Sequence, residues 1–465
     1  MIANNIFSRF SYLDSFFLFV FSFVFGLAII FFSLVMPYLS VFIVFLLPLV
    51  FFVLAYKAII FGVFGVLFFF SNVLISVVGF GLVGLDYDSS IVFSQGLDFL
   101  FVFSFFSCLV VFGKIKARES IVFFVSLFVY FLGIIDNGLT PATIYYRFMI
   151  YAFLLYHAGV FFSRDERFLV LLKFFIFCFF VFSVILLFLE LAFTEDFYYI
   201  FSFNDYFSKK MNVGYFLAPE EFYLKNNKYL FNFEGFKEIK VMRPYGALLH
   251  PISLGYFFSI VSVYLFYRKH YFLFLLSALL VVIMGAKGAA ISLAMTIFVY
   301  VVLVHSCFSR SKVFLVLVFL SIALSCLLFY IGFSVGNPHM VKLAWSINEV
   351  LNAPFGKGLG SSGVFSSIGS GNDESLFKDS GLAVLLGQFG VLSIIVYFVY
   401  YNIVYRCFAC FWGSRLVLFP ILAVFVLMNS FFQEEGFSPY SLGLCLFLMG
   451  VWSEKYKSEG KYKSE

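Results

Sequence analysis

Apolar runs about as long as a membrane-spanning helix recur along the whole chain, separated by short polar breaks. A helix needs about 20 predominantly apolar residues to cross the hydrocarbon core of a bilayer. Backbone polar groups find no water in that core, so runs of this kind form helices, which pair their own N–H and C=O groups. The pattern predicts an all-α fold, a polytopic bundle of about fourteen transmembrane helices.

The polar breaks set the expected bounds of the spans. We expect one integral membrane domain over residues 1–465, with the first run retained because no small-residue cleavage site follows it. The predicted spans are 15–36, 37–56, 58–80, 97–113, 121–135, 142–162, 168–193, 245–267, 271–286, 288–306, 313–333, 380–402, 414–432 and 437–452.

Composition excludes an ordinary soluble fold. The chain is 63% hydrophobic and 12% charged, whereas soluble domains carry about 25% charged residues. The net charge is +5, and the basic residues lie between apolar runs, which argues against a nucleic-acid partner. The seven cysteines imply no disulfide framework. Cys407 and Cys410 lack a second pair or a nearby His, so we expect no metal and no cofactor.

The distribution of positive charge predicts the orientation. The expected outer loops 81–96, 136–141 and 433–436 contain no Lys or Arg. Because cytoplasmic loops carry the excess of basic residues, we place both chain ends, including the Lys-rich tail 453–465, on the cytoplasmic side of a bacterial inner membrane. The basic residues in or beside cytoplasmic loops are then Lys57, Lys114, Lys116, Arg118, Arg164, Arg167, Arg268, Lys269, Arg310, Lys312, Arg406 and Arg415.

Two longer segments, 194–242 and 334–379, are predicted to be large periplasmic loops. Soluble segments between spans are common places for binding and catalytic residues. In the first, aromatic and charged residues alternate around Tyr223 and Tyr229. This alternation suits either a helix lying on the outer leaflet or stacking against sugars.

Arg147 is an ionisable side chain inside a predicted span. Such groups are costly in lipid and indicate a functional site unless they are paired structurally. Arg147 lies near the outer end of the span 142–162, where its guanidinium either reaches the interface or faces a polar cavity. We retain Arg147 as a candidate functional residue.

A second basic motif follows the first large loop. Arg243-Pro244-Tyr245-Gly246 leads through His250-Pro251 into the predicted span 245–267. A guanidinium at this place suits bidentate contacts with phosphate oxygens, and helix N-terminal amides add partial positive charge. Arg243 is therefore a candidate ligand of phosphate oxygens, and an ordinary interfacial Arg is the alternative.

Lys287 is the only charge in Gly285-Ala286-Lys287-Gly288-Ala289, a predicted tight outer turn between two spans. Small neighbours let helices pack closely and let an anionic ligand approach the backbone. Lys287 is thus a candidate for binding an anionic ligand. Alternatively, a lysine at a hairpin tip merely stays in water.

Acidic residues in the second large loop complete the candidate set. The preceding run Phe355-Gly356-Lys357-Gly358-Leu359-Gly360 fits no phosphate-loop or dinucleotide pattern, because no strand precedes it. A carboxylate near cations at the outer face can orient or deprotonate a sugar hydroxyl. We therefore name Asp379 and Glu374 as candidate catalytic residues, with Ser380 beside them as a substrate ligand. Solvated loop acids are the alternative.

These outer-face motifs, in this order, resemble those of the O-antigen polymerase and O-antigen ligase superfamily of integral membrane glycosyltransferases. The resemblance covers roughly residues 140–440. It rests on Arg243, Gly246, His250 and Pro251 at the span entry, on the small-basic-Gly-Ala turn around Lys287, and on the Gly-rich run 355–360.

One position departs from the ligases of this superfamily. Where they carry a His-Asn-like pair, this chain has Asp379-Ser380. The missing His favours a polymerase over a lipopolysaccharide ligase. In the turn around Lys287, the superfamily more often has Arg.

The resemblance implies a fold like that of the polytopic, lipid-carrier-dependent (GT-C) glycosyltransferases. It implies a substrate too: repeat-unit oligosaccharides on undecaprenyl pyrophosphate, joined at the periplasmic face without a metal. With that substrate, the expected pyrophosphate and substrate ligands are Arg147, Arg243, His250, Lys287 and Ser380. Membrane lipids and a chain-length regulator protein are the expected partners. A ligase-like glycosyltransferase and a transporter or flippase for lipid-linked saccharides remain the alternatives, although no internal repeat of the transporter kind is visible.

Overall fold

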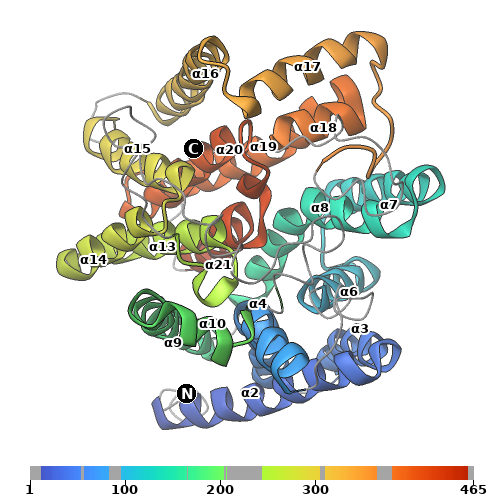
Figure 1. Ribbon diagram of the computed structural model, residues 1–465, viewed down its shortest axis with the longest axis vertical. Helices are drawn as coiled ribbons and strands as arrows, with labels where there is room; N and C mark the ends of the chain where they lie inside the picture. The colour runs from blue at the N-terminus through green and yellow to red at the C-terminus, as the bar shows by residue number, and fades with distance from the viewer. Residues whose placement is uncertain are drawn as a thin grey trace. The chain divides into compact units, whose positions relative to one another are not determined.

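The computed structural model describes residues 12–53, 57–82, 96–164, 166–203, 206, 243–303, 309–363 and 380–458. Every regular element in these ranges is helical (Figure 1). Seven of the helices are long and apolar enough to cross a membrane. The predicted all-α fold is confirmed, and these helices indicate a multi-pass membrane protein.

The chain divides into two compact units, each built from separate stretches of sequence. The first comprises Met1–Val111, Phe162–Leu254 and Ile283–Gly285, and the second comprises Phe112–Phe161, Gly255–Val282 and Ala286–Glu465. Because the chain passes between the units repeatedly, neither corresponds to one sequence segment. A single integral membrane domain stays a prediction.

The first unit contains seven described helical elements and one short 3₁₀ turn. They are α2 (Tyr12–Val35), α3 (Pro37–Val53), α4 (Lys57–Leu74), the π-helical continuation η2 (Ile75–Leu82), α6 (Leu97–Val111), α9 (Glu166–Ala192), α10 (Thr194–Ile200) and the turn η4 (Gly246–Leu248).

Helices α2, α4 and α9 pack side by side in this unit (Figure 1). Gly62 of α4 faces Ser22 of α2, and a Cβ at Gly65 would lie 3.0 Å from the ring of Phe175 in α9. Small residues at membrane-helix interfaces allow this close approach. Near the start of both helices, the ring centroids of Phe61 and Phe168 are 4.1 Å apart. The contacts progress from Phe61–Phe168 to Gly65–Phe175, so α4 and α9 run in the same direction.

The second unit contains the remaining helices. They are α7 (Ala117–Asn137), α8 (Leu139–Phe162), most of α13 (Pro251–Tyr267), α14 (Tyr271–Ile283), α15 (Lys287–Leu303), α16 (Arg310–Ser334), α17 (Pro338–Asn352), α18 (Gly381–Phe389), α19 (Ser393–Phe411), α20 (Leu418–Asn429) and α21 (Leu444–Ser458).

Helix α20 forms the core of the second unit. Every residue from Leu418 to Asn429 is buried, and helices α15, α16, α19 and α21 pack around it. A helix that is apolar all round is expected in such a position. The segment that joins α20 to α21 therefore begins inside the protein rather than at its surface.

Helices lie at all of the predicted spans, but several bounds differ. Pro251 begins α13, where the span was predicted from 245, because residues 246–248 form a 3₁₀ turn. The predicted span 380–402 is broken at Gly390, whose φ of +55° ends α18. Lys287 was predicted to lie in a turn, whereas it is the first residue of α15.

The two predicted outer loops are partly helical. Helix α10 lies in the first, and the amphipathic helix α17 lies in the second, where Leu343 packs against Ala383 and Phe432. The aromatic stretch around Tyr223 and Tyr229 lies outside the described residues. The helix α17 was not predicted, because the Gly- and Ser-rich sequence around it obscured its apolar face.

Candidate functional site

A buried carboxylate holds the turn that follows Arg243. Glu190, near the end of α9, is fully buried. Its Oε1 accepts hydrogen bonds from the hydroxyl of Tyr198 and the backbone N–H of Tyr245, both at 2.7 Å. Its Oε2 accepts the backbone N–H of Gly246 at 2.8 Å. Hydrogen bonds to a carboxylate are among the stronger ones, so α9 fixes the turn firmly.

The same turn is also tied to α4. The side-chain amide of Asn72 donates to the backbone oxygen of Leu248 at 3.3 Å. Gly246 has a φ of +58°, a left-handed conformation that glycine adopts without steric cost. The turn therefore has one defined shape, set by two helices of the first unit.

Arg243 lies at the start of this turn and is half-buried. Its Nε donates to the backbone oxygen of Met284 at 2.9 Å. A Cβ at Gly285 would lie 3.7–3.9 Å from the Arg243 side chain, an ordinary van der Waals contact, so it is the φ of +59° that favours glycine at this position. A guanidinium has five N–H donors in a rigid fork, so the bond at Nε sets the plane in which the others point.

His250 is the N-terminal cap of α13. Its Nδ1 accepts the backbone N–H of Ser253 at 3.2 Å and lies 3.0 Å from the hydroxyl of Ser253. Capping of this kind satisfies one of the unpaired N–H groups at a helix start. In the described structure, His250 thus orients the helix entry, and its predicted role as a phosphate ligand stays a prediction.

In the second unit, polar groups gather where α20 ends. The side-chain amide of Asn429 donates to the backbone oxygen of Gly288 and to the hydroxyl of Ser292, both at 2.6 Å. A Cβ at Gly288 would lie 2.7 Å from the Tyr256 hydroxyl and 2.8 Å from Gln433 Oε1. Gly288 therefore allows a buried tyrosine and an amide to reach the first turn of α15, directly beside the exposed Lys287.

Ser380 lies against the same segment. Its hydroxyl donates to the backbone oxygen of Phe431 and accepts the N–H of Ala383 at 3.1 Å, which caps α18. Ser380 is fully buried. Ser380 and Gly288, the residue after Lys287, thus both contact residues 429–433.

Arg147 belongs to the same unit. It is half-buried, and its guanidinium carbon lies 5.5 Å from the ring centroid of Tyr151, a cation–π distance. The adjacent Phe148 packs edge-on against Phe437, with centroids 5.2 Å apart. Helix α8 therefore contacts the α20–α21 connection one residue away from Arg147.

The Gly-rich run is packed against helix ends. Gly356, Gly358 and Gly360 have φ values of +76°, +86° and +90°. The side-chain amide of Asn137 donates to the backbone oxygen of Leu359 at 3.1 Å, and backbone N–H groups at 357 and 358 donate to the end of α18. These glycines dock the run between α7 and α18.

No protein-family model, curated protein or solved structure matches the chain.

The structure gathers the predicted residues into two groups. Arg243 and His250 share one turn in the first unit, whereas Lys287, Ser380 and Arg147 lie on elements around the α20–α21 connection in the second. Asp379 and Glu374 lie outside the described residues.

Sequence reasoning missed the residues that organise both groups. Glu190 was an ionisable residue in a predicted span and could have been singled out with Arg147 on that ground. Asn429 and Gln433 gave a weaker signal, a polar interruption between two apolar runs. Tyr256 gave none, because tyrosine is ordinary in an apolar run of this aromatic chain.

Proposed function

We propose that this protein is a polysaccharide polymerase that joins oligosaccharide repeat units carried on undecaprenyl pyrophosphate. The observation that carries the proposal is the geometry of the Arg243 turn. A guanidinium at the entry of an apolar helix is oriented by Met284, and its turn is held by Glu190 and Asn72. Such a preorganised cation suits a diphosphate that approaches from the membrane surface.

The reaction joins two lipid-linked saccharides. A hydroxyl oxygen of one repeat unit attacks the anomeric carbon of the glycan on a second carrier. The bond from that carbon to the pyrophosphate oxygen breaks, and its electron pair leaves with the pyrophosphate. The hydroxyl proton passes to a base, which we assign to Asp379, with Glu374 as the second candidate. Arg243 stabilises the negative charge that develops on the leaving group.

The other predicted residues retain supporting roles in this proposal. Lys287 and Arg147 are proposed to contact anionic groups of the substrate, and His250 and Ser380 shape the entries of α13 and α18. Fourteen spans, cytoplasmic ends and an inner-membrane location belong to the proposal as well. The shared direction of α4 and α9 supports it, because the predicted order makes both cross from inside to outside.

Reconstituted vesicles test this function. Purified protein is supplied with lipid-linked repeat units, and the saccharides on the carrier are then separated by length. We expect a ladder of polymers that requires only the protein and the lipid-linked repeats. Translocation of single repeats without elongation would instead identify a transporter, and transfer only to a lipid A acceptor would identify a ligase.

A further inference from the structure

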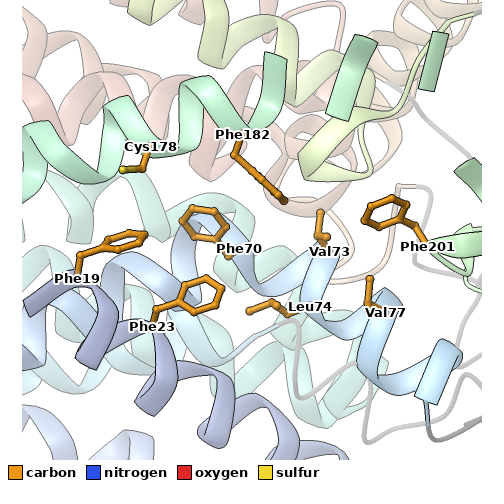
Figure 2. Close-up of a pocket in the computed structure, with 9 residues that line it drawn as sticks. All are labelled: Phe19, Phe23, Phe70, Val73, Leu74, Val77, Cys178, Phe182 and Phe201. Atoms are coloured by element: carbon orange, nitrogen blue, oxygen red, sulfur yellow. The ribbon is translucent and has the colours of Figure 1, made fainter. Parts of the chain in front are cut away.

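A cavity of about 380 Å³ opens between α2, α4 and α9 in the first unit (Figure 2). This volume falls in the range of about 300–1,000 Å³ that is typical of ligand pockets. Nine side chains line it, among them Phe70 and Val73 from α4, Cys178 from α9, and Phe201. Apart from the thiol of Cys178, all of them are hydrocarbon, so the cavity suits an apolar ligand.

The helices around the cavity also present apolar residues outward. Phe21 and Val24 of α2 are 56% and 62% exposed, and Phe177 of α9 is 63% exposed. In a multi-pass membrane protein, such surfaces face lipid tails. The cavity therefore lies between helices whose outer faces suit contact with lipid.

The cavity is connected to the Arg243 turn by shared helices. Asn72, which bonds Leu248 of the turn, stands between the cavity residues Phe70 and Val73. On the other side, Ser76 donates to the backbone oxygen of Phe201 at 2.8 Å. The residues that shape the cavity and those that hold the turn are thus neighbours on one helix.

A second connection runs through α9 and α10. Tyr198 donates to Glu190, which holds the turn, and Phe201 follows Tyr198 by one helical turn and lines the cavity. The apolar cavity and the cationic turn are held by the same helices. Together they suit a ligand with a hydrocarbon chain and an anionic head. A lipid phosphate has both features, and a guanidinium can bind its phosphate oxygens in a bidentate manner.

We propose that this cavity binds part of the polyisoprenoid chain of a lipid-linked saccharide whose phosphate lies at the Arg243 turn. The choice of a polyisoprenoid chain rests on the proposed function, whereas a hydrocarbon chain with an anionic head follows from the cavity and the turn. Most of the residues that line the cavity precede residue 140 and so lie outside the range of the family resemblance. The cavity is formed mainly by the N-terminal helices of this chain.

Cys178 provides a direct readout of occupancy, because it lines the cavity. The full-length protein in nanodiscs is labelled with a small maleimide, and the rates at Cys178 and Cys108 are compared by mass spectrometry. Cys108 is an internal control, since it is a free, half-buried cysteine in the same unit that does not line the cavity.

Undecaprenyl phosphate should slow labelling of Cys178 about tenfold at a concentration about ten times its Kd, because the unoccupied fraction falls as 1/(1 + [L]/Kd). The rate at Cys108 should stay unchanged. Equal protection by phosphatidylglycerol at the same concentration would overturn the polyisoprenoid assignment, and unchanged labelling of Cys178 would overturn the site.

Two variants test the cavity and the Arg243 turn separately. Leu74→Trp should fill the cavity, so the lipid should no longer raise the unfolding temperature of this variant. In Leu279→Trp, at an exposed position of α14, the lipid should still raise it. Arg243→Ala should raise the concentration needed for protection. Protection that is insensitive to both Leu74→Trp and Arg243→Ala would contradict the proposal.

The outcome is distinguishable from that of the proposed function. Polymer formation without slower labelling of Cys178 would refute lipid binding in the cavity but not the polymerase function. Protection without polymer would refute the polymerase and leave lipid-phosphate binding in place.

Discussion

The Oε2 atom of Glu190 accepts the backbone N–H of Gly246 at 2.8 Å, across 56 residues of sequence. Together with the bond from Tyr245, it makes the end of α9 the support for the segment that presents Arg243. This relationship connects a residue with no proposed chemical role to the residue on which the proposed chemistry depends.

Removing this support should loosen the turn. Glu190→Ala removes the acceptor of three donors, the backbone N–H groups of Tyr245 and Gly246 and the hydroxyl of Tyr198. Each buried donor left unsatisfied costs about 1–3 kcal/mol. We expect a lower unfolding temperature in detergent and shorter polymer. Glu190→Gln keeps one acceptor oxygen, so its losses should be intermediate. Equal stability of Glu190→Ala and wild type would show that the carboxylate does not support the turn.

The charge at Arg243 should be needed for polymer but not for folding. Arg243→Ala should abolish long polymer at unchanged protein abundance, because the developing negative charge on the leaving group loses its cation. Arg243→Lys should restore part of the activity, since a lysine keeps the charge but not the planar fork. Arg268→Ala, at an exposed turn, is the matched control. Wild-type ladders from Arg243→Ala would refute the assigned role.

A base at Asp379 can be tested apart from the cation. Asp379→Asn keeps the size of the side chain but cannot accept the hydroxyl proton. We expect a loss of polymer formation in vesicles with retained binding of the lipid-linked substrate. Full activity would leave Asp379 a positioning role only, and the same substitution at Glu374 then tests the second candidate.

Close packing at Gly288 should not tolerate a methyl group. Gly288→Ala would place its Cβ 2.7 Å from the Tyr256 hydroxyl and 2.8 Å from Gln433 Oε1. Overpacking of this kind costs about 1–3 kcal/mol, which should appear as a lower unfolding temperature. Combining it with Tyr256→Phe removes one of the two clashing atoms and should recover part of the loss. Ile291→Ala, at a partly exposed position of α15, serves as the comparison.

Asn429 should be important to the attachment of α15 to α20. Asn429→Ala removes both donated hydrogen bonds and leaves the Gly288 oxygen and the Ser292 hydroxyl short of a partner. We expect a loss of about 1–3 kcal/mol, measured by thermal unfolding. Asn352→Ala, at an exposed end of α17, should be near neutral. A similar effect at both positions would mean that the buried amide has no special role.

The sequence by itself determined the helices. Each apolar run is long enough to satisfy its own backbone hydrogen bonds, so its helical state needs no information from the rest of the chain. The regions around Arg243, Lys287 and Asp379 were recognisable for a similar reason, because charges and glycines stand out against runs of Phe, Leu and Val. The same local patterns placed a helix at every predicted span but did not predict the break at Gly390 or the helix α17.

The tertiary structure alone decided which residues support those regions. Glu190 meets Gly246, Asn72 meets Leu248 and Asn429 meets Gly288 across long stretches of sequence. No periodicity encodes such pairings, because every apolar helix offers similar surfaces to its neighbours. Which helix faces pack together depends on the summed fit of many side chains. That packing decided which buried polar groups lie close enough to form hydrogen bonds with one another.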